Sequence, residues 1–402
     1  MPRLPLAFIL MTVAIDAMGI GLIFPVMPDL IREVSDTTLS GAAIQGGLLI
    51  SAFAAMQFVF GPVIGNLSDA YGRRPVLLVS LAVMAADYVV MALAGSLWVL
   101  LAGRIVGGIA AATHATALAY TADISAPRDK SANFGLISAA FGAGFVIGPV
   151  LGGLLGDLGT RAPFWVAAAL AGLNLLFGLA VMPESLRPAL RRPFQWRRAN
   201  PLNAFRAIRR LPGLGPLLAV FTLYHLATEV YPVIWAYFTQ ERFGWDTRLV
   251  GISLAAYGVA LAVVQAGLVR PALRWLGEAR TVQAGFVCDI GVGAVFAVMT
   301  SGVAAMILCP VSAIGGVTLP ALQGVLSKSV PDDAQGELQG VLGSLMALAM
   351  VLSPLFYTAA FRVFTAADAA VYLPGAPFLL SILLTLPAIA IFARASLRAP
   401  AT

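Results

Sequence analysis

Stretches of about 20 mostly apolar residues recur from one end of this chain to the other. A helix of that length crosses the roughly 30 Å hydrocarbon core of a bilayer. In lipid every backbone N–H and C=O must find a partner within the protein, which favours α-helices over irregular structure. The sequence therefore predicts an all-α membrane protein of twelve transmembrane helices, at residues 5–27, 44–65, 75–95, 98–121, 134–156, 163–182, 213–236, 249–268, 281–299, 303–326, 337–359 and 371–393.

The composition agrees with a membrane protein. Hydrophobic residues make up 60% of the 402 positions and charged residues 11%, whereas soluble domains carry about 25% charged residues. The net charge of +6 raises the question of a nucleic-acid partner, but lysines and arginines lie mostly in short segments between apolar stretches. Membrane topology explains that placement. We therefore expect the lipid bilayer as surroundings and no nucleic-acid partner.

Residues 183–212 interrupt the apolar pattern with eight arginines, one acid and several prolines. This basic segment separates six predicted spans in residues 1–182 from six in residues 213–402. Two such six-helix halves commonly pack around a site near the middle of the membrane in transporters. We expect a linker at this segment and a domain on either side of it.

Basic residues are distributed unequally between the two predicted sides of the membrane. Twelve spans put both termini on one side, whose loops hold 19 lysines and arginines. The opposite loops hold Arg32, Arg161, Arg242, Arg248 and Arg362. By the positive-inside rule, both termini and the basic linker are cytoplasmic.

Several ionisable residues fall inside the predicted spans. A charge at the bilayer centre costs about 2.5–3.5 kcal/mol on insertion scales, so each such residue is a candidate for a functional site in a cavity. An aspartate there can carry a proton or hold a cation, and a hydrogen bond that only packs two helices is the alternative. The candidates are Asp16, Asp87, Arg104, His225, Glu229 and Asp289, with His114 as a weaker one.

Arg104, His225 and Glu229 each leave two interpretations open. Arg104 stays charged at any accessible pH and needs a buried partner, either in a fixed ion pair or in proton coupling. His225 and Glu229 stand at i and i+4 on one helical face, an arrangement suited to proton relay. Alternatively, Glu229 lies at the membrane interface, where Tyr231 and Trp235 would form part of an aromatic belt.

Two motifs contain glycines at positions where helices can approach or bend. GNLSDAYGRRP, at residues 65–75, sets Asp69 beside two arginines in a tight turn, where charge pairs can hold one conformational state or simply anchor the loop. GFVIGPVLGG, at residues 144–153, puts Pro149 within a span, where it kinks the helix. Glycine-rich faces allow close packing of helices, either mobile or static.

At these residues the chain resembles the major facilitator superfamily, and within it the twelve-span drug/proton antiporters. Residues 65–75 are similar to the first cytoplasmic signature of the superfamily, except that Ala70 stands where a basic residue is usual. Arg104 with the two glycines after Val106 resembles the fourth-span signature, and residues 144–153 resemble the fifth-span signature of antiporters. The resemblance implies a gating role for Gly65, Asp69, Gly72, Arg73, Arg74, Gly148 and Pro149.

Further segments resemble the tetracycline/proton antiporters. They are IDAMGIGLIFPVMP from Ile15, DYVVMA from Asp87, ERFGW from Glu241, GISLAA from Gly251, and LPALQGVLS with GELQGVL within residues 319–342. The resemblance implies export of a tetracycline chelated to a divalent cation such as Mg²⁺, in exchange for a proton, across a bacterial inner membrane. It implies no cofactor and no directly bound metal, because the cation arrives with the drug. We expect a monomer.

The same resemblance implies roles for individual residues. Substrate binding would involve Asp16, Gln57, Asp87 and Gln265, and proton coupling would involve Asp16, Arg104 and Asp289.

One position departs from the family. Leu261 stands where the eighth span usually has a histidine, and we hypothesise that His225 and Glu229 supply a relocated titratable pair. Such a pair would alter the coupling or select a different cationic substrate.

Two other functions are compatible with the architecture. The chain can be an exporter of another amphipathic drug or metabolite, or a membrane receptor or scaffold that transports nothing. An enzyme is not expected, because no nucleophile and base, and no set of metal ligands, occur at reactive spacing.

Overall fold

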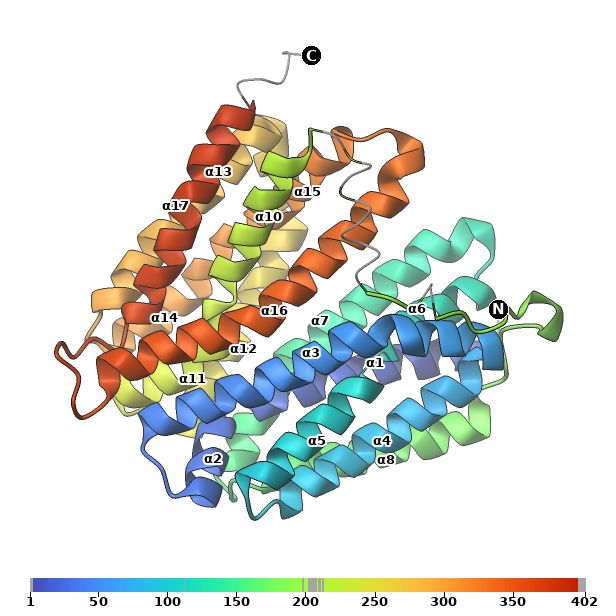
Figure 1. Ribbon diagram of the computed structural model, residues 1–402, viewed down its shortest axis with the longest axis horizontal. Coiled ribbons are helices and arrows are strands. Elements are labelled where there is room, and N and C mark those ends of the chain that lie inside the picture. The colour runs from blue at the N-terminus through green and yellow to red at the C-terminus, as the bar shows by residue number, and fades with distance from the viewer. Residues whose placement is uncertain are drawn as a thin grey trace. The chain divides into compact units, whose positions relative to one another are not determined.

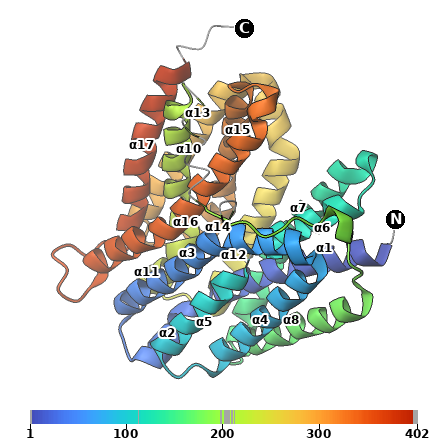
Figure 2. The same cartoon turned by 45° about the vertical axis from the view of Figure 1, so that its right-hand side comes forward.

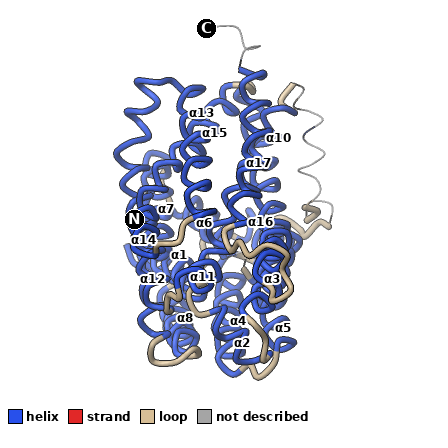
Figure 3. Tube along the Cα trace, turned by 90° about the vertical axis from the view of Figure 1, so that its left-hand side faces the viewer, coloured by secondary structure: helices blue, strands red, loops and turns tan. Residues whose placement is uncertain are grey.

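The computed structural model describes residues 3–111, 113–196, 199–201, 208, 211 and 213–396. Within these residues the chain forms helices and loops, with no strand (Figure 3). The predicted all-α membrane fold is confirmed. The α-helices are α1 (Arg3–Ile23), α2 (Met27–Ser35), α3 (Leu39–Tyr71), α4 (Arg73–Leu93), α5 (Leu97–Ala110), α6 (Thr113–Ile124), α7 (Lys130–Gly156), α8 (Ala162–Val181), α10 (Gly215–Thr228), α11 (Val230–Phe243), α12 (Thr247–Val263), α13 (Val269–Val298), α14 (Gly302–Ser312), α15 (Thr318–Lys328), α16 (Gln335–Thr365) and α17 (Ala376–Ser396).

Eleven helical segments of the described chain are long and apolar enough to cross a membrane. One of them, Thr247–Val298, has 52 residues, far more than the roughly 20 that one crossing needs. It bends at Gly277, whose φ of 73° and ψ of 170° lie outside the helical region. Two predicted spans, 249–268 and 281–299, lie on either side of this bend. The segment therefore accounts for two crossings, which brings the count to the twelve predicted.

The chain folds as two compact units. Unit 1 comprises Met1–Thr37, Ala52–Pro201 and Thr247–Ile252, and unit 2 comprises Thr38–Ser51, Leu202–Asp246 and Ser253–Thr402. The predicted division into residues 1–182, a linker at 183–212 and residues 213–402 stays a prediction.

In unit 1, α1 packs along α7, and α4 packs along α8 (Figure 2). Gly144, Gly148 and Gly152 lie one turn apart on α7, and a Cβ at any of them would overlap a backbone carbonyl of α1. A Cβ at Gly21 of α1 would in turn lie 2.6 Å from the ring of Pro149. These glycines therefore bring the backbones of α1 and α7 into direct contact, as small residues do at close helix crossings in membranes.

In unit 2, α10 packs along α17, and α13 packs against both α15 and α17 (Figure 1). Three departures from α-helical geometry interrupt the spans of this unit. Glu229, between α10 and α11, has a φ of −63° and a ψ of −10°, closer to 3-10 than to α-helical geometry. The chain also forms a π-helix at Val264–Leu268 and a 3-10 helix at Ala313–Val317. Such departures occur frequently at functional sites.

Candidate functional site

Asp87 and Arg104 form a buried ion pair between α4 and α5 of unit 1. The two residues are only 4% and 8% exposed, so the charges are balanced by each other and not by water. A Cβ at Gly103 or Gly107 would lie 2.8 or 2.7 Å from a carboxylate oxygen of Asp87, so two glycines of α5 make room for it. The Arg104 guanidinium also lies 5.3 Å from the centre of the Phe53 ring, within cation–π range. The ion pair thus links Asp87, which was predicted to bind substrate, to Arg104, which was predicted to take part in proton coupling.

Asp16, on α1, has different surroundings from Asp87. Its polar neighbour is Thr113 at the start of α6, and no described lysine or arginine forms an ion pair with it. Tyr88 places its hydroxyl against α1 at Gly19, where a Cβ would overlap it. Of these two aspartates in unit 1, Asp16 is therefore the one without a counter-ion.

The two glutamines predicted to bind substrate differ in how they are engaged. Gln57 on α3 donates from Nε2 to the carbonyl of Ala111 at 3.2 Å. Ala111 directly follows α5, where carbonyls lack partners within the helix, so this bond has a structural explanation. Gln265 lies in the π-helix and is exposed. Binding of substrate by either residue stays a prediction.

Asp289 lies on α13 of unit 2, against the 3-10 helix that follows α14. Its Oδ1 faces Gly315, where a Cβ would overlap it. The Tyr224 hydroxyl lies beside the carboxylate and 3.5 Å from the Gly315 carbonyl oxygen. The other carboxylate oxygen, Oδ2, is buried without a hydrogen-bond partner. No described cationic side chain pairs with Asp289, so this carboxylate can accept a proton without breaking an ion pair.

Asp87 and Asp289 occupy corresponding places in the two halves of the chain. Each lies on the third span of its half and is accommodated by glycine on the helix that follows, Gly103 and Gly107 in one case and Gly315 in the other. Only Asp87 has an arginine partner. The two halves are therefore alike in how they make room for a carboxylate and unlike in its charge balance.

His225 and Glu229 do not pair with each other through their side chains. The His225 ring packs against the Phe221 ring, with centroids 4.4 Å apart, and its Nε2 is buried without a hydrogen-bond partner. Glu229 is the single residue between α10 and α11, and its backbone N–H donates to the His225 carbonyl at 3.2 Å. Hydroxyls of Tyr357 and Ser381 donate to the Ala227 carbonyl, two residues before Glu229, at 3.1 and 2.9 Å. The side chain of His114 lies outside the described part of the chain.

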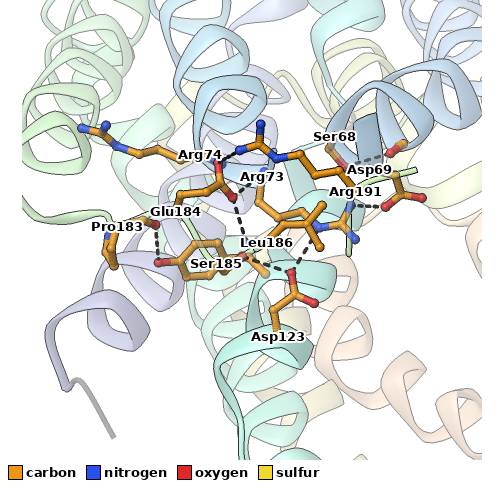
Figure 4. Close-up of polar contacts among 12 residues, drawn as sticks. Ser68, Asp69, Arg73, Arg74, Asp123, Pro183, Glu184, Ser185, Leu186 and Arg191 are labelled. Carbon is orange, nitrogen blue, oxygen red and sulfur yellow. Dashed lines mark hydrogen bonds and ion pairs between the residues drawn. The ribbon is translucent and has the colours of Figure 1, made fainter. Parts of the chain in front are cut away.

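Figure 4 shows the predicted gating motif where α3 ends and α4 begins. Arg73 pairs with Asp69 at 2.6 Å and with Asp123, at the end of α6, at 3.3 Å. Arg74 donates to the carbonyl of Leu179 on α8 at 3.0 Å. The motif thus connects α3, α4, α6 and α8 within unit 1, while its role in gating stays a prediction.

Glu184, just after α8, completes this cluster and was missed by the sequence interpretation. Its carboxylate accepts hydrogen bonds from the backbone N–H groups of Arg73 at 2.9 Å and Arg74 at 3.3 Å (Figure 4). These are the first two N–H groups of α4, which have no acceptor within the helix and favour a negative charge. Gly72 has a φ of 110°, and a Cβ there would overlap Glu184. The sequence feature that could have drawn attention to Glu184 is that it is the single acid in the arginine-rich segment 183–212.

The chain beyond Glu184 stays close to the end of α3. The Arg192 N–H donates to the Asp69 carbonyl at 3.1 Å, and the Asn66 side chain donates to the Gln195 carbonyl at 2.7 Å. The first part of the predicted linker is therefore held to the end of α3 within unit 1 by one backbone–backbone and one side chain–backbone hydrogen bond.

Asp16 and Asp87 belong to unit 1 and Asp289 belongs to unit 2. A shared pocket for the three aspartates stays a prediction, as do the transport roles assigned to the individual residues.

Comparisons with known proteins agree with this fold. Residues 9–354 match the family model of the Major Facilitator Superfamily. The class C tetracycline resistance protein of Escherichia coli is 44% identical over 354 residues, covering 88% of this chain and 89% of that protein. The class G tetracycline resistance protein of Vibrio anguillarum is 42% identical, covering 87% and 88%.

Among solved structures, the human organic anion transporter TETRAN superposes with a TM-score of 0.71 at 24% identity, over 97% of this chain and 99% of that one. This likeness establishes the fold alone, while the two bacterial relatives extend the similarity to the sequence of nearly the whole chain. The resemblance drawn from the sequence motifs is confirmed: the chain belongs to the Major Facilitator Superfamily and, within it, to the family of the tetracycline resistance proteins.

Proposed function

We propose that this protein exports a tetracycline-type drug from the cytoplasm in exchange for protons. The drug travels as a chelate of Mg²⁺ or another divalent cation, so the metal is cargo and the protein holds no cofactor. The protein acts as a monomer in a bacterial inner membrane, with both termini in the cytoplasm, and it leaves the drug chemically unchanged. The similarity to tetracycline resistance proteins over 88% of the chain supports this proposal.

The observation that carries the coupling mechanism is the different charge balance of Asp87 and Asp289. Arg104 holds Asp87 in an ion pair, so protonating Asp87 would leave a buried guanidinium without its partner. Each aspartate has one buried carboxylate oxygen without a hydrogen-bond partner, but Asp289 has no described lysine or arginine in an ion pair with it. We therefore assign the exchanged proton to Asp289. Because linkage is reciprocal, a cationic drug that favours the ionised carboxylate releases a proton, and protonation weakens drug binding.

Alternating access gives this linkage a direction. In the inward-open state the chelate binds and a proton leaves Asp289 to the cytoplasm. After the change to the outward-open state, protonation from outside expels the drug, and the protonated carrier returns. Asp16, which unlike Asp87 has no ion pair with a described lysine or arginine, contributes to holding the positive chelate.

The test is proton release from inside-out vesicles that have been acidified by respiration and loaded with a pH-sensitive dye. Adding tetracycline with Mg²⁺ should release protons from wild-type vesicles and not from Asp289→Asn vesicles. Removing free Mg²⁺ with a chelator should abolish the response to tetracycline. A control variant, Arg248→Gln, changes an exposed residue and should respond like the wild type. Equal responses from wild type and Asp289→Asn would contradict the assignment of the proton.

A second candidate function, export of a different amphipathic cation, is favoured by one observation. Leu261 replaces the histidine expected by resemblance and packs toward Gly316, and Glu229 adds an acid to unit 2. The same vesicles distinguish the two functions, because a metal-free cationic dye such as ethidium would then release protons and tetracycline would not. Resistance of a pump-deficient bacterium to the two compounds should rank them in the same order.

We assign the role of the relocated titratable pair to Glu229 alone. Glu229→Gln should reduce the number of protons released per drug, because Glu229 is an acid inside the helical segment Gly215–Phe243 and has no described cationic partner. His225→Ala should leave the proton number unchanged and lower thermal stability, because its ring packs on Phe221. Wild-type coupling in Glu229→Gln would remove Glu229 from the mechanism.

A further inference from the structure

The first two turns of α13 carry an exposed basic and aromatic surface, which we call the α13 arginine face: Arg270, Arg274 and Trp275. Arg270 and Arg274 stand one turn apart at i and i+4, and both are exposed. Trp275 is 77% exposed, among the highest values of any large hydrophobic residue in the described chain. The three side chains therefore all lie on the exposed side of the first two turns of α13.

The opposite side of the first two turns of α13 is buried in the hydrophobic core of unit 2. Val269 is buried, and together with Leu273 it packs in a cluster with Val264, Ala313 and Val317. A helix with one face anchored and the other exposed holds Arg270 and Arg274 in a fixed orientation. The α13 arginine face is thus a built surface of the folded unit and not a loose loop.

Within the described residues, no acid forms an ion pair with either arginine. Neither Arg270 nor Arg274 forms an ion pair with a described residue, and the nearest acid in sequence, Glu278, pairs with Lys328 at 2.8 Å. Two unpaired arginines at i and i+4 repel each other, which is unfavourable unless an anion binds between them. The two positive charges of this surface would therefore be balanced by a bound anion.

The position of the surface identifies the kind of anion. It lies between the π-helix that ends one span and the bend at Gly277 that precedes the next, at the predicted cytoplasmic end of both. A tryptophan exposed at the end of a span is typical of the headgroup layer, where its ring contacts acyl chains and its N–H contacts polar groups. Anionic phospholipids give the cytoplasmic surface a negative potential that attracts such basic segments.

We propose that the α13 arginine face binds the headgroup of an anionic phospholipid in the cytoplasmic leaflet. Arg270 and Arg274 contact the phosphodiester, and Trp275 lies against the upper part of the acyl chains. Unit 1 has a similar combination on the same predicted side, where Trp196 is 75% exposed and follows Arg192. The inference concerns lipid binding and does not depend on which drug is carried.

The test measures lipid preference at Trp275 in the full-length protein. The protein is reconstituted in phosphatidylcholine vesicles that contain brominated phosphatidylglycerol or brominated phosphatidylcholine as a quencher of tryptophan fluorescence. Subtracting the signal of Trp275→Phe isolates the contribution of Trp275. Each arginine should raise the affinity for phosphatidylglycerol relative to phosphatidylcholine about fivefold, so the wild type should prefer phosphatidylglycerol by up to about 30-fold. High salt should reduce this preference.

Variants distinguish lipid binding at Arg270 and Arg274 from a general attraction of the positively charged surface to anionic lipid. Arg270→Gln with Arg274→Gln should abolish the preference, while Arg274→Lys should keep most of it. The matched control, Arg128→Gln with Lys130→Gln, removes two exposed positive charges on the same predicted side of unit 1 and should behave like the wild type. Thermal unfolding verifies that each variant is folded. An unchanged preference in the double variant, or an equal loss in the control, would overturn the proposal.

Discussion

A buried charge in a membrane protein is tolerated when a partner is built beside it, and Asp87 with Arg104 is such a case. Breaking a buried pair leaves one charge uncompensated, which destabilises by about 3–5 kcal/mol, whereas removing both charges can be nearly neutral. Two glycines on α5 fit the Asp87 carboxylate, so the site is shaped for this pair. The energetic coupling between the two residues should therefore be strong.

We expect Asp87→Asn and Arg104→Gln each to lower the free energy of unfolding in detergent by about 3 kcal/mol or more. The double variant should lose much less than the sum, because no buried charge is left alone. Thermal or denaturant unfolding of the purified protein measures all three. Strictly additive losses would mean that the two side chains do not interact in the folded protein.

The charges themselves were visible in the sequence, but their partners were not. Asp87, Arg104 and Asp289 stand out because ionisable residues are rare in apolar stretches. Their different surroundings depend on which helices touch, which hydropathy does not encode. Glu184 was missed for the same reason, since it bonds to a residue 111 positions away in the chain.

At the scale of elements, the contact between α1 and α7 shows why glycine recurs in the fifth span. Gly144, Gly148 and Gly152 face the backbone of α1, where no side chain fits. Gly142, on the same helix, has nothing within 4 Å of the place where a Cβ would stand. The motif at residues 144–153 therefore includes positions that packing requires, and a neighbouring glycine outside it is not constrained in this way.

Replacing Gly148 by alanine should force α1 and α7 apart, lowering both thermal stability and drug export. Gly142→Ala is the matched control, and it should be neutral or stabilising by up to about 1 kcal/mol, because alanine favours helix more than glycine does. The unfolding midpoint and the vesicle proton-release signal measure the two effects. Equal behaviour of the two variants would show that the close contact is dispensable.

The helices were easier to predict than their irregularities. Twelve apolar stretches are a strong signal, because each must be long enough to cross the bilayer. The π-helix at Val264–Leu268 and the 3-10 helix at Ala313–Val317 leave no trace in hydropathy, since they change backbone hydrogen bonding and not residue type. The bend at Gly277 lies in a predicted loop, whereas the structure has a helix on both sides of it.

At the scale of the whole molecule, the orientation in the membrane follows from the unequal distribution of basic residues. We expect an impermeant thiol reagent to label Leu158→Cys, an 80% exposed position on the predicted outer side, in intact cells. Arg128→Cys, on the predicted cytoplasmic side, should react only after the cells are permeabilised. Cys288 and Cys309 are first replaced by serine to remove background. The reverse pattern would invert the topology.

The direct contact between the backbones of α1 and α7 also affects how well the membrane retains its proton gradient. A continuous chain of water molecules would let protons leak across the membrane. Each water needs a void of roughly 10–15 Å³ and polar partners. Where Gly144, Gly148 and Gly152 meet the backbone of α1, the two helices exclude such a chain along this crossing. Protons therefore cannot leak through the membrane along this helix crossing while the carrier is at rest.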